Sequence, residues 1–212
     1  RYMKGEIRFV GTGIPEIRKL LLEMNRSDGL DQLPMNRQVN LVNSLMRSKL
    51  AEHKLAAILY IQLFWLTKQK NTFLLRIISD WFDEGYIFDW NTTDWLCVKV
   101  LAPMLDSGDR EVLWTLKIWN RHPYLWKARA SLVPFAVSKR ILEHSKDIER
   151  LSGFLIRRDE RFAKTTVGWV MREYSKWDED FVLAFLSKHV KHTPWEVKRN
   201  ALKYYRQKRR NP

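Results

Sequence analysis

Apolar residues recur every three to four positions along almost the whole chain, which is the spacing that gives a helix one buried face. The 8 glycines and 7 prolines fall mostly between these segments or at their starts, as expected where one helix ends and the next begins. The sequence lacks the alternating β-branched residues around a tight turn that mark a β-hairpin. We therefore predict an all-α protein of about 11 helices, over residues 15–26, 37–48, 52–68, 72–84, 92–105, 110–120, 123–138, 146–156, 160–176, 179–190 and 194–208.

The predicted helices after the first fall into pairs joined by short loops, and the pairs repeat after roughly 35 residues, the size of a helical solenoid unit. Arg129, Lys164 and Arg199 are spaced 35 residues apart, each early in the second helix of its pair, and Asp94 lies another 35 residues upstream. In a solenoid such positions form a row on one face. Chance is the alternative, because 38 basic residues offer many spacings. We predict one continuous domain over residues 1–212.

The charge balance is strongly basic, with 38 Lys and Arg against 24 Asp and Glu and a net charge of +14. Such an excess attracts polyanions, of which nucleic acid is the common one and an anionic membrane surface the alternative. The longest apolar run, residues 55–66, is shorter than the roughly 20 residues of a membrane span and contains Gln62. The charge therefore makes nucleic acid a candidate partner, and the absence of a long apolar run counts against a membrane-spanning segment.

Other signs of chemistry are few. Ten tryptophans exceed average usage, so we expect some of them in the core and others at a ligand surface. The single cysteine, Cys97, excludes an internal disulfide and lies in an apolar stretch typical of a buried side chain. His189 and His192 are three residues apart, but no Cys or carboxylate cluster completes a metal site with them. We expect neither a metal nor an organic cofactor.

Several short segments carry a resemblance that extends over nearly the whole chain. One is Trp-Asn-Thr-Thr-Asp at residues 90–94. The others are Arg-Tyr-Met-Lys at 1–4, Phe-Val-Gly at 9–11, Pro-Glu-Ile-Arg at 15–18, Leu-Trp-Lys-Ala-Arg-Ala at 125–130 and Gly-Trp-Val-Met-Arg-Glu-Tyr at 168–174. In this order and spacing they resemble the AlkD family, the HEAT-repeat alkylpurine DNA glycosylases of DNA alkylation repair.

The resemblance implies a superhelical solenoid of HEAT-like antiparallel helix pairs curved around DNA, in agreement with the helical pattern. It also implies base excision repair of duplex DNA, in which the N-glycosidic bond of positively charged N3- or N7-alkylated purines is hydrolysed. The resemblance thus implies a DNA-binding protein without membrane association, located inside the cell with the DNA, in the cytoplasm or nucleoid of a bacterium or the nucleus of a eukaryote. We expect the protein to act as a monomer. Carried over by position, the resemblance makes Asp94 the catalytic carboxylate and Arg129 a phosphate contact, with cleft aromatic residues Tyr2, Trp90 and Trp169.

These residue types suit the implied chemistry. An alkylated base that already carries a positive charge leaves without a general acid, while the sugar becomes oxocarbenium-like. Asp94 would stabilise this cation and orient the attacking water, and basic neighbours would keep the carboxylate ionised. Trp90, four residues earlier, would share its helix face and turn an indole toward the positive charge. Arg129, Lys164 and Arg199 would bind backbone phosphates.

Other interpretations stay open for the protein and for each residue. A non-catalytic protein that binds branched or distorted DNA is the second hypothesis, because position 91 is Asn where the family example has Asp. A protein-interaction solenoid is the third. Asp94 near a helix start would also favour the helix dipole whatever its function. Trp90 and Trp169 would otherwise be core residues, Tyr2 a frayed terminal residue, and Arg129 the partner of a neighbouring carboxylate.

Overall fold

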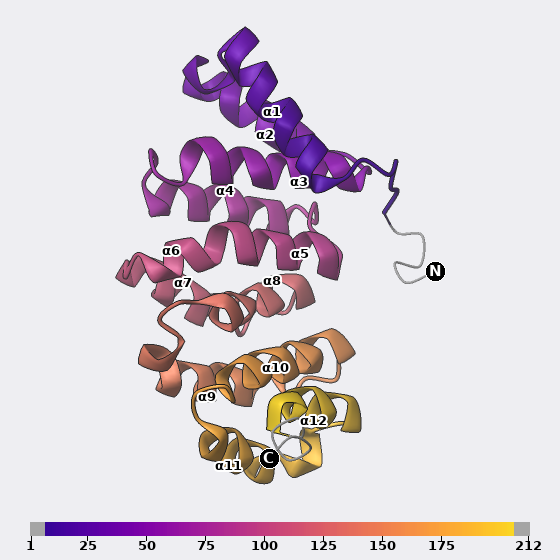
Figure 1. Cartoon of the computed structure of the whole chain (residues 1–212), viewed down its shortest axis with the longest axis vertical. Coiled ribbons are helices and arrows are strands. Elements are labelled where there is room, and N and C mark those ends of the chain that lie inside the picture. The colour runs from indigo at the N-terminus through magenta and orange to yellow at the C-terminus, as the bar shows by residue number, and fades with distance from the viewer. Residues whose placement is uncertain (1–6, 206–212) are drawn as a thin grey trace. The chain divides into compact units, whose positions relative to one another are not determined.

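The computed structural model describes residues 7–205, so Tyr2 lies outside the described residues. Over this range the chain forms twelve α-helices together with short 3₁₀ and π-helical turns (Figure 1). The β structure within the range is an isolated bridge between Arg8 and Leu50. The predicted all-α class is therefore confirmed. The chain divides into two compact units, residues 1–100 and 101–212, and the prediction of a single domain stays a prediction.

The first unit is built around one central helix. Its helices are α1 (Ile14–Asp28), α2 (Met35–Arg47), α3 (Ala51–Tyr60), α4 (Asn71–Asp83) and α5 (Trp90–Leu96). The α3 helix contacts α1, α2 and α5, and almost all of its residues are buried. Its Tyr60 hydroxyl and the indole N–H of Trp65 both donate to the side-chain oxygen of Gln38, at 3.0 and 2.7 Å. The buried side-chain oxygen of Gln38 therefore has hydrogen-bond donors within the core of this unit.

The second unit is a stack of shorter helices around α10. Its elements are α6 (Ala102–Asp106), α7 (Arg110–Trp119), α8 (Leu125–Ala130), α9 (Ser145–Leu155), α10 (Arg161–Tyr174), α11 (Glu179–Lys188) and α12 (Trp195–Ala201). The α10 helix contacts α8, α9, α11 and α12. A Cβ atom on Gly168 of α10 would lie 3.2 Å from the backbone oxygen of Val197 in α12. The close approach of these two helices therefore depends on a residue without a side chain.

Helix starts follow local capping chemistry. The side chains of Asp89, Asp109 and Asp178 accept backbone N–H groups in the first turns of α5, α7 and α11. These bonds satisfy amides that have no partner within the helix. The helix predicted from residue 92 begins at Trp90 instead, because Asp89 supplies the cap.

The predicted helix over residues 123–138 is wrong in its second half. The α8 helix ends at Ala130, and a 3₁₀ helix follows over Val133–Val137. Pro134 explains the break, since proline lacks the backbone N–H and its ring clashes with the carbonyl group four residues earlier. Two other predicted helices contain π-helical turns, at Ile61–Trp65 and Cys97–Leu101, which the apolar spacing did not indicate.

Candidate functional site

The start of α5 carries the aromatic residue and the carboxylate that the sequence singled out. Trp90 is the first residue of this helix and Asp94 follows one turn later, and both side chains are partly exposed. Asp89 fixes the turn between them: its Oδ1 accepts the Thr92 N–H at 2.8 Å, and its backbone oxygen accepts the Thr93 hydroxyl at 2.7 Å. Residues four apart lie on one helix face, so Trp90 and Asp94 are neighbours on a capped, buried turn.

Behind this turn lies a lysine that the sequence analysis did not identify. Lys54, in the first turn of α3, is 1% exposed, and its ammonium group donates to the backbone oxygens of Met46 and Tyr86 at 2.5 and 2.6 Å. Burial lowers the pKa of Lys54 to about 8, although the negative charge of Asp89 acts in the opposite direction. The only available signal was its position, one residue before Leu55 at the apolar start of a helix.

The segment that follows the first six residues is attached to the same end of α3. The Glu52 carboxylate accepts the backbone N–H groups of Val10 and Gly11, both at 2.9 Å. Arg8 exchanges backbone hydrogen bonds with Lys49 and Ala51. Burial raises the pKa of Glu52, but the backbone N–H groups outweigh this effect and leave its pKa below the ordinary value. The segment is therefore held in place, whereas the role predicted for Tyr2 stays a prediction.

The second unit carries the cations of the predicted row at equivalent helix positions. The three cations occupy the fourth or fifth position of their helices, with Arg129 in α8, Lys164 in α10 and Arg199 in α12. The α10 helix contacts both α8 and α12. Exposure increases along the row: Arg129 is buried, Lys164 is partly exposed and Arg199 is exposed. The repeat spacing of 35 residues thus corresponds to equivalent positions in every second helix of this unit.

Arg129 differs from the other two cations because the residue is only 5% exposed. Its Nη1 donates to the backbone oxygen of Phe162 at 2.7 Å and to the hydroxyl of Thr166. Both partners belong to α10, so Arg129 joins α8 to α10 by hydrogen bonds. Its contact with a DNA phosphate stays a prediction.

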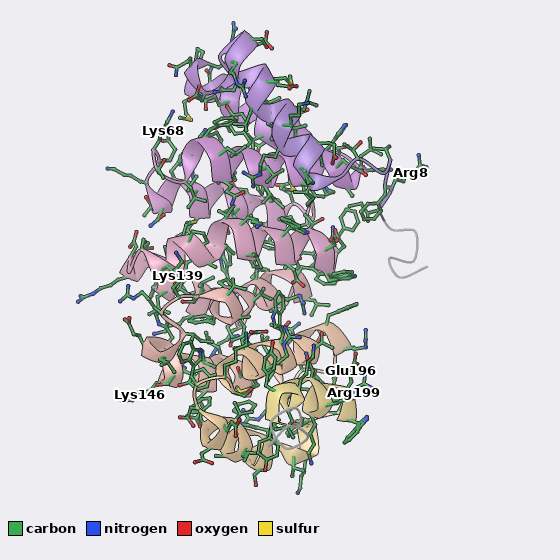
Figure 2. The ribbon with its side chains drawn as sticks, in the orientation of Figure 1. Arg8, Lys68, Lys139, Lys146, Glu196 and Arg199 are labelled. Atoms are coloured by element: carbon green, nitrogen blue, oxygen red, sulfur yellow. The ribbon has the colours of Figure 1, made fainter. Side chains whose placement is uncertain are left out.

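Arg199 lines a surface hollow of about 380 Å³ at the start of α12. The lining residues are Thr165, Glu196, Val197, Arg199, Asn200 and Lys203. Figure 2 shows Glu196 and Arg199 together at one edge of the second unit, and Lys139 and Lys146 at its opposite edge. Glu196 forms an ion pair with Arg161, which leaves the positive charge of Arg199 and Lys203 in excess around the hollow.

Trp169 lies on α10, next to Gly168, and is partly exposed. Because Gly168 packs against Val197, the position of Trp169 is tied to the contact between α10 and α12. The structure thus places Trp90 with Asp94 in the first unit, and the cation row with Trp169 in the second. The hypothesis that these two groups serve one cleft stays a prediction.

Two further properties concern the described residues, 7–205. No cluster of three or more His, Cys, Asp or Glu side chains in this range is arranged to hold a metal ion. None of the helices in the range has both the length and the apolar character needed to cross a membrane.

Comparison with known proteins identifies a family and a similar solved structure. A family model described as "DNA alkylation repair enzyme" matches residues 1–205. A solved structure, described as a predicted DNA alkylation repair enzyme from Enterococcus faecalis, superposes with a TM-score of 0.80 at 16% sequence identity. This superposition covers 96% of the present chain and 91% of the other. Curated proteins gave no significant match. At this identity the structural likeness shows the fold, and it confirms the predicted solenoid of helix pairs.

Proposed function

The chain belongs to the family of DNA alkylation repair enzymes, and from this premise we propose that it is a DNA glycosylase acting on alkylated purines. The proposed substrate is duplex DNA that contains a positively charged N3- or N7-alkylated purine. The reaction breaks the bond between the purine nitrogen and C1′, and the purine leaves as a neutral base with the bonding electrons. Water then adds to C1′ and gives up a proton.

The observation that carries this proposal is the pairing of Trp90 and Asp94 on the first turns of α5. The partly exposed carboxylate of Asp94 would stabilise the oxocarbenium-like sugar and orient the attacking water. The indole of Trp90, one turn away, would contact the positively charged base or sugar. Because Asp89 caps the turn, both side chains start from a fixed backbone, which is what a preorganised electrostatic site requires.

The charge of the protein supports DNA as the partner. A net charge of +14 favours any polyanion, and Lys164 and Arg199 provide a local part of that charge in the second unit. We propose that these two side chains bind phosphates of the duplex, with Arg129 as an additional contact. A monomer is the proposed functional form.

Release of base from a duplex that contains N7-methylguanine tests the proposal. The wild-type protein should release N7-methylguanine, and Asp94→Asn should be slower by about ten- to a thousandfold, the usual loss when one electrostatic stabiliser is removed. Asp80→Asn, which changes an exposed aspartate on α4, is the matched control and should retain wild-type activity. Equal rates for wild type and Asp94→Asn would exclude the proposed role of Asp94.

A second function is favoured by Asn91, which occupies the motif position where the family example has Asp. In this alternative the protein binds branched or distorted DNA without breaking a bond. Competition between a four-way junction and a plain duplex of equal length distinguishes the two functions. Preference for the junction, together with no release of base, would support the alternative, and equal affinity for both DNA forms would remove it.

A further inference from the structure

Lys54 is a buried cation that connects three segments of the first unit. Its ammonium group donates to the backbone oxygen of Met46, near the end of α2, and to that of Tyr86, in the connection between α4 and α5. The same group lies 5.1 Å from the centre of the Phe88 ring. Tyr86 and Phe88 both belong to the short segment that leads into α5. Lys54 therefore holds the chain immediately before the helix that carries the candidate carboxylate.

The residue between this segment and α5 is a buried carboxylate. Asp89 is 3% exposed, and its Oδ1 accepts the Thr92 N–H that begins the helix. Its Oδ2 is also buried and makes no hydrogen bond within the described part of the chain. The positive charge of Lys54 is attracted to this carboxylate. Lys54 thus acts on the helix start in two ways, through the backbone oxygen of Tyr86 and through the charge of Asp89.

A requirement for stability alone does not account for a lysine at this position. Burying an ammonium group costs free energy, and a well-packed apolar side chain of similar length is often neutral or stabilising in the place of a buried charge. The α3 and α5 helices already pack side by side in the first unit (Figure 1), so an apolar residue would extend a contact that exists. An ammonium group can hold a neighbouring backbone oxygen in a fixed direction through a hydrogen bond, whereas an apolar side chain makes no such bond.

We propose that Lys54 is a positioning residue for the site on α5: by fixing the backbone at Tyr86 and facing Asp89, it sets the direction in which Trp90 and Asp94 point. This inference rests on the glycosylase function proposed above. Lys54 itself is buried and does not touch the substrate. It affects catalysis through the orientation of α5.

Substitution of Lys54 by Met, which has a similar length and no charge, tests the role in catalysis. We expect the single-turnover rate of N7-methylguanine release to fall by about tenfold or more, the size of effect that a misplaced catalytic group produces. The dissociation constant for the same duplex should stay within about twofold of wild type, because the cations that bind phosphate are unchanged. Lys70→Met, which changes an exposed lysine before α4, is the matched control and should leave the rate unchanged.

The pH dependence gives a readout that a purely structural role would not affect. Because the pKa of Lys54 is about 8, its ammonium group loses a proton as the pH rises through that value. Asp89 is the carboxylate whose charge acts on this group, and it raises the pKa of Lys54 against the effect of burial. The wild-type rate should therefore decline above pH 8, while the Lys54→Met rate is already low and should show no such decline.

Amide hydrogen exchange at Thr92 and Thr93 separates this proposal from the proposed function, because it needs no activity. In Lys54→Met these amides should exchange at least about tenfold faster than in wild type, while amides of α11 exchange at the same rate in both proteins. In wild type alone, the protection of Thr92 should decrease between pH 7 and 9 relative to α11, which tests the idea even if the variant does not fold. Unchanged exchange at α5 would overturn the positioning role. Absence of base release by wild type would overturn the glycosylase function only.

Discussion

Replacing Gly168 by Ala should destabilise the second unit although alanine is the better helix former. A Cβ atom at this position would lie 3.2 Å from the backbone oxygen of Val197, 3.3 Å from its Cα and 3.3 Å from its Cγ1. Two of these three atoms belong to the backbone of α12, so rotation of a side chain cannot relieve the contact. The neighbouring helix must move instead.

The magnitude follows from two opposing contributions. Alanine in a helix interior is more favourable than glycine by about 1 kcal/mol. Overpacking by one methyl group against atoms that cannot yield costs about 1–3 kcal/mol. The net loss in the free energy of unfolding should therefore be about 1 kcal/mol, which corresponds to a decrease in Tm of about 2–4 °C for a chain of this length.

Gly153 provides the matched control within the same unit. It lies in α9, and a Cβ atom there would be 3.5 Å from Nε2 and 3.7 Å from Cε1 of His189, which is ordinary van der Waals contact. Gly153→Ala should thus keep most of the gain in helix propensity and stabilise the protein by about 0.5–1 kcal/mol. Urea denaturation followed by far-UV circular dichroism measures both variants. The packing argument is refuted if the two substitutions change the unfolding midpoint in the same direction.

Two further predictions concern DNA binding and pH. Replacing Lys164 and Arg199 together by Ala should reduce the slope of log affinity against log salt by about 2, because two phosphate contacts are lost. The double variant of Lys139 and Lys146, at the opposite edge of the second unit, should leave the slope nearly unchanged, and equal effects of the two double variants would contradict the assignment (Figure 2). Burial lowers the pKa of His189 below the ordinary value of 6.5, so as the pH falls the unfolded chain takes up a proton before the folded protein does. Stability should therefore decrease as the pH falls through that range, with a smaller decrease in His189→Gln, as measured by urea midpoints at pH 7.5 and 5.5.

The apolar spacing predicted long helices well where no special residue intervened. The α10 helix was expected over residues 160–176 and extends over Arg161–Tyr174, with its apolar positions facing the neighbouring helices. The same spacing continued through Pro134, where the chemistry of proline overrides the pattern. The apolar spacing did not predict the π-helical turn at Ile61–Trp65. One added residue inside a buried helix leaves the apolar composition of that segment unchanged.

The sequence predicted which kinds of side chain the candidate site contains, but not which of them are buried or what they contact. The spacing of Asp94, Arg129, Lys164 and Arg199 predicted equivalent positions in successive repeats, and the three cations do occupy such positions in the second unit. The burial of Arg129 depends on where Phe162 and Thr166 lie in three dimensions, which the spacing does not contain. Lys54 was missed for a related reason, since a lysine near a helix start is usually exposed.

The π-helical turn at Ile61–Trp65 also affects how the first unit tolerates changes in chain length. Such a turn holds about one residue more than an α-helical turn, and each residue of a helix rotates the chain by about 100°. Shortening this turn by one residue would restore regular helix and rotate α3 relative to Phe64 and Trp65. Glu52 and Lys54 would then both face away from the groups they bind. A deletion in the turn that directly follows the buried α3 helix would thus release the segment before α1 and the start of α5 together.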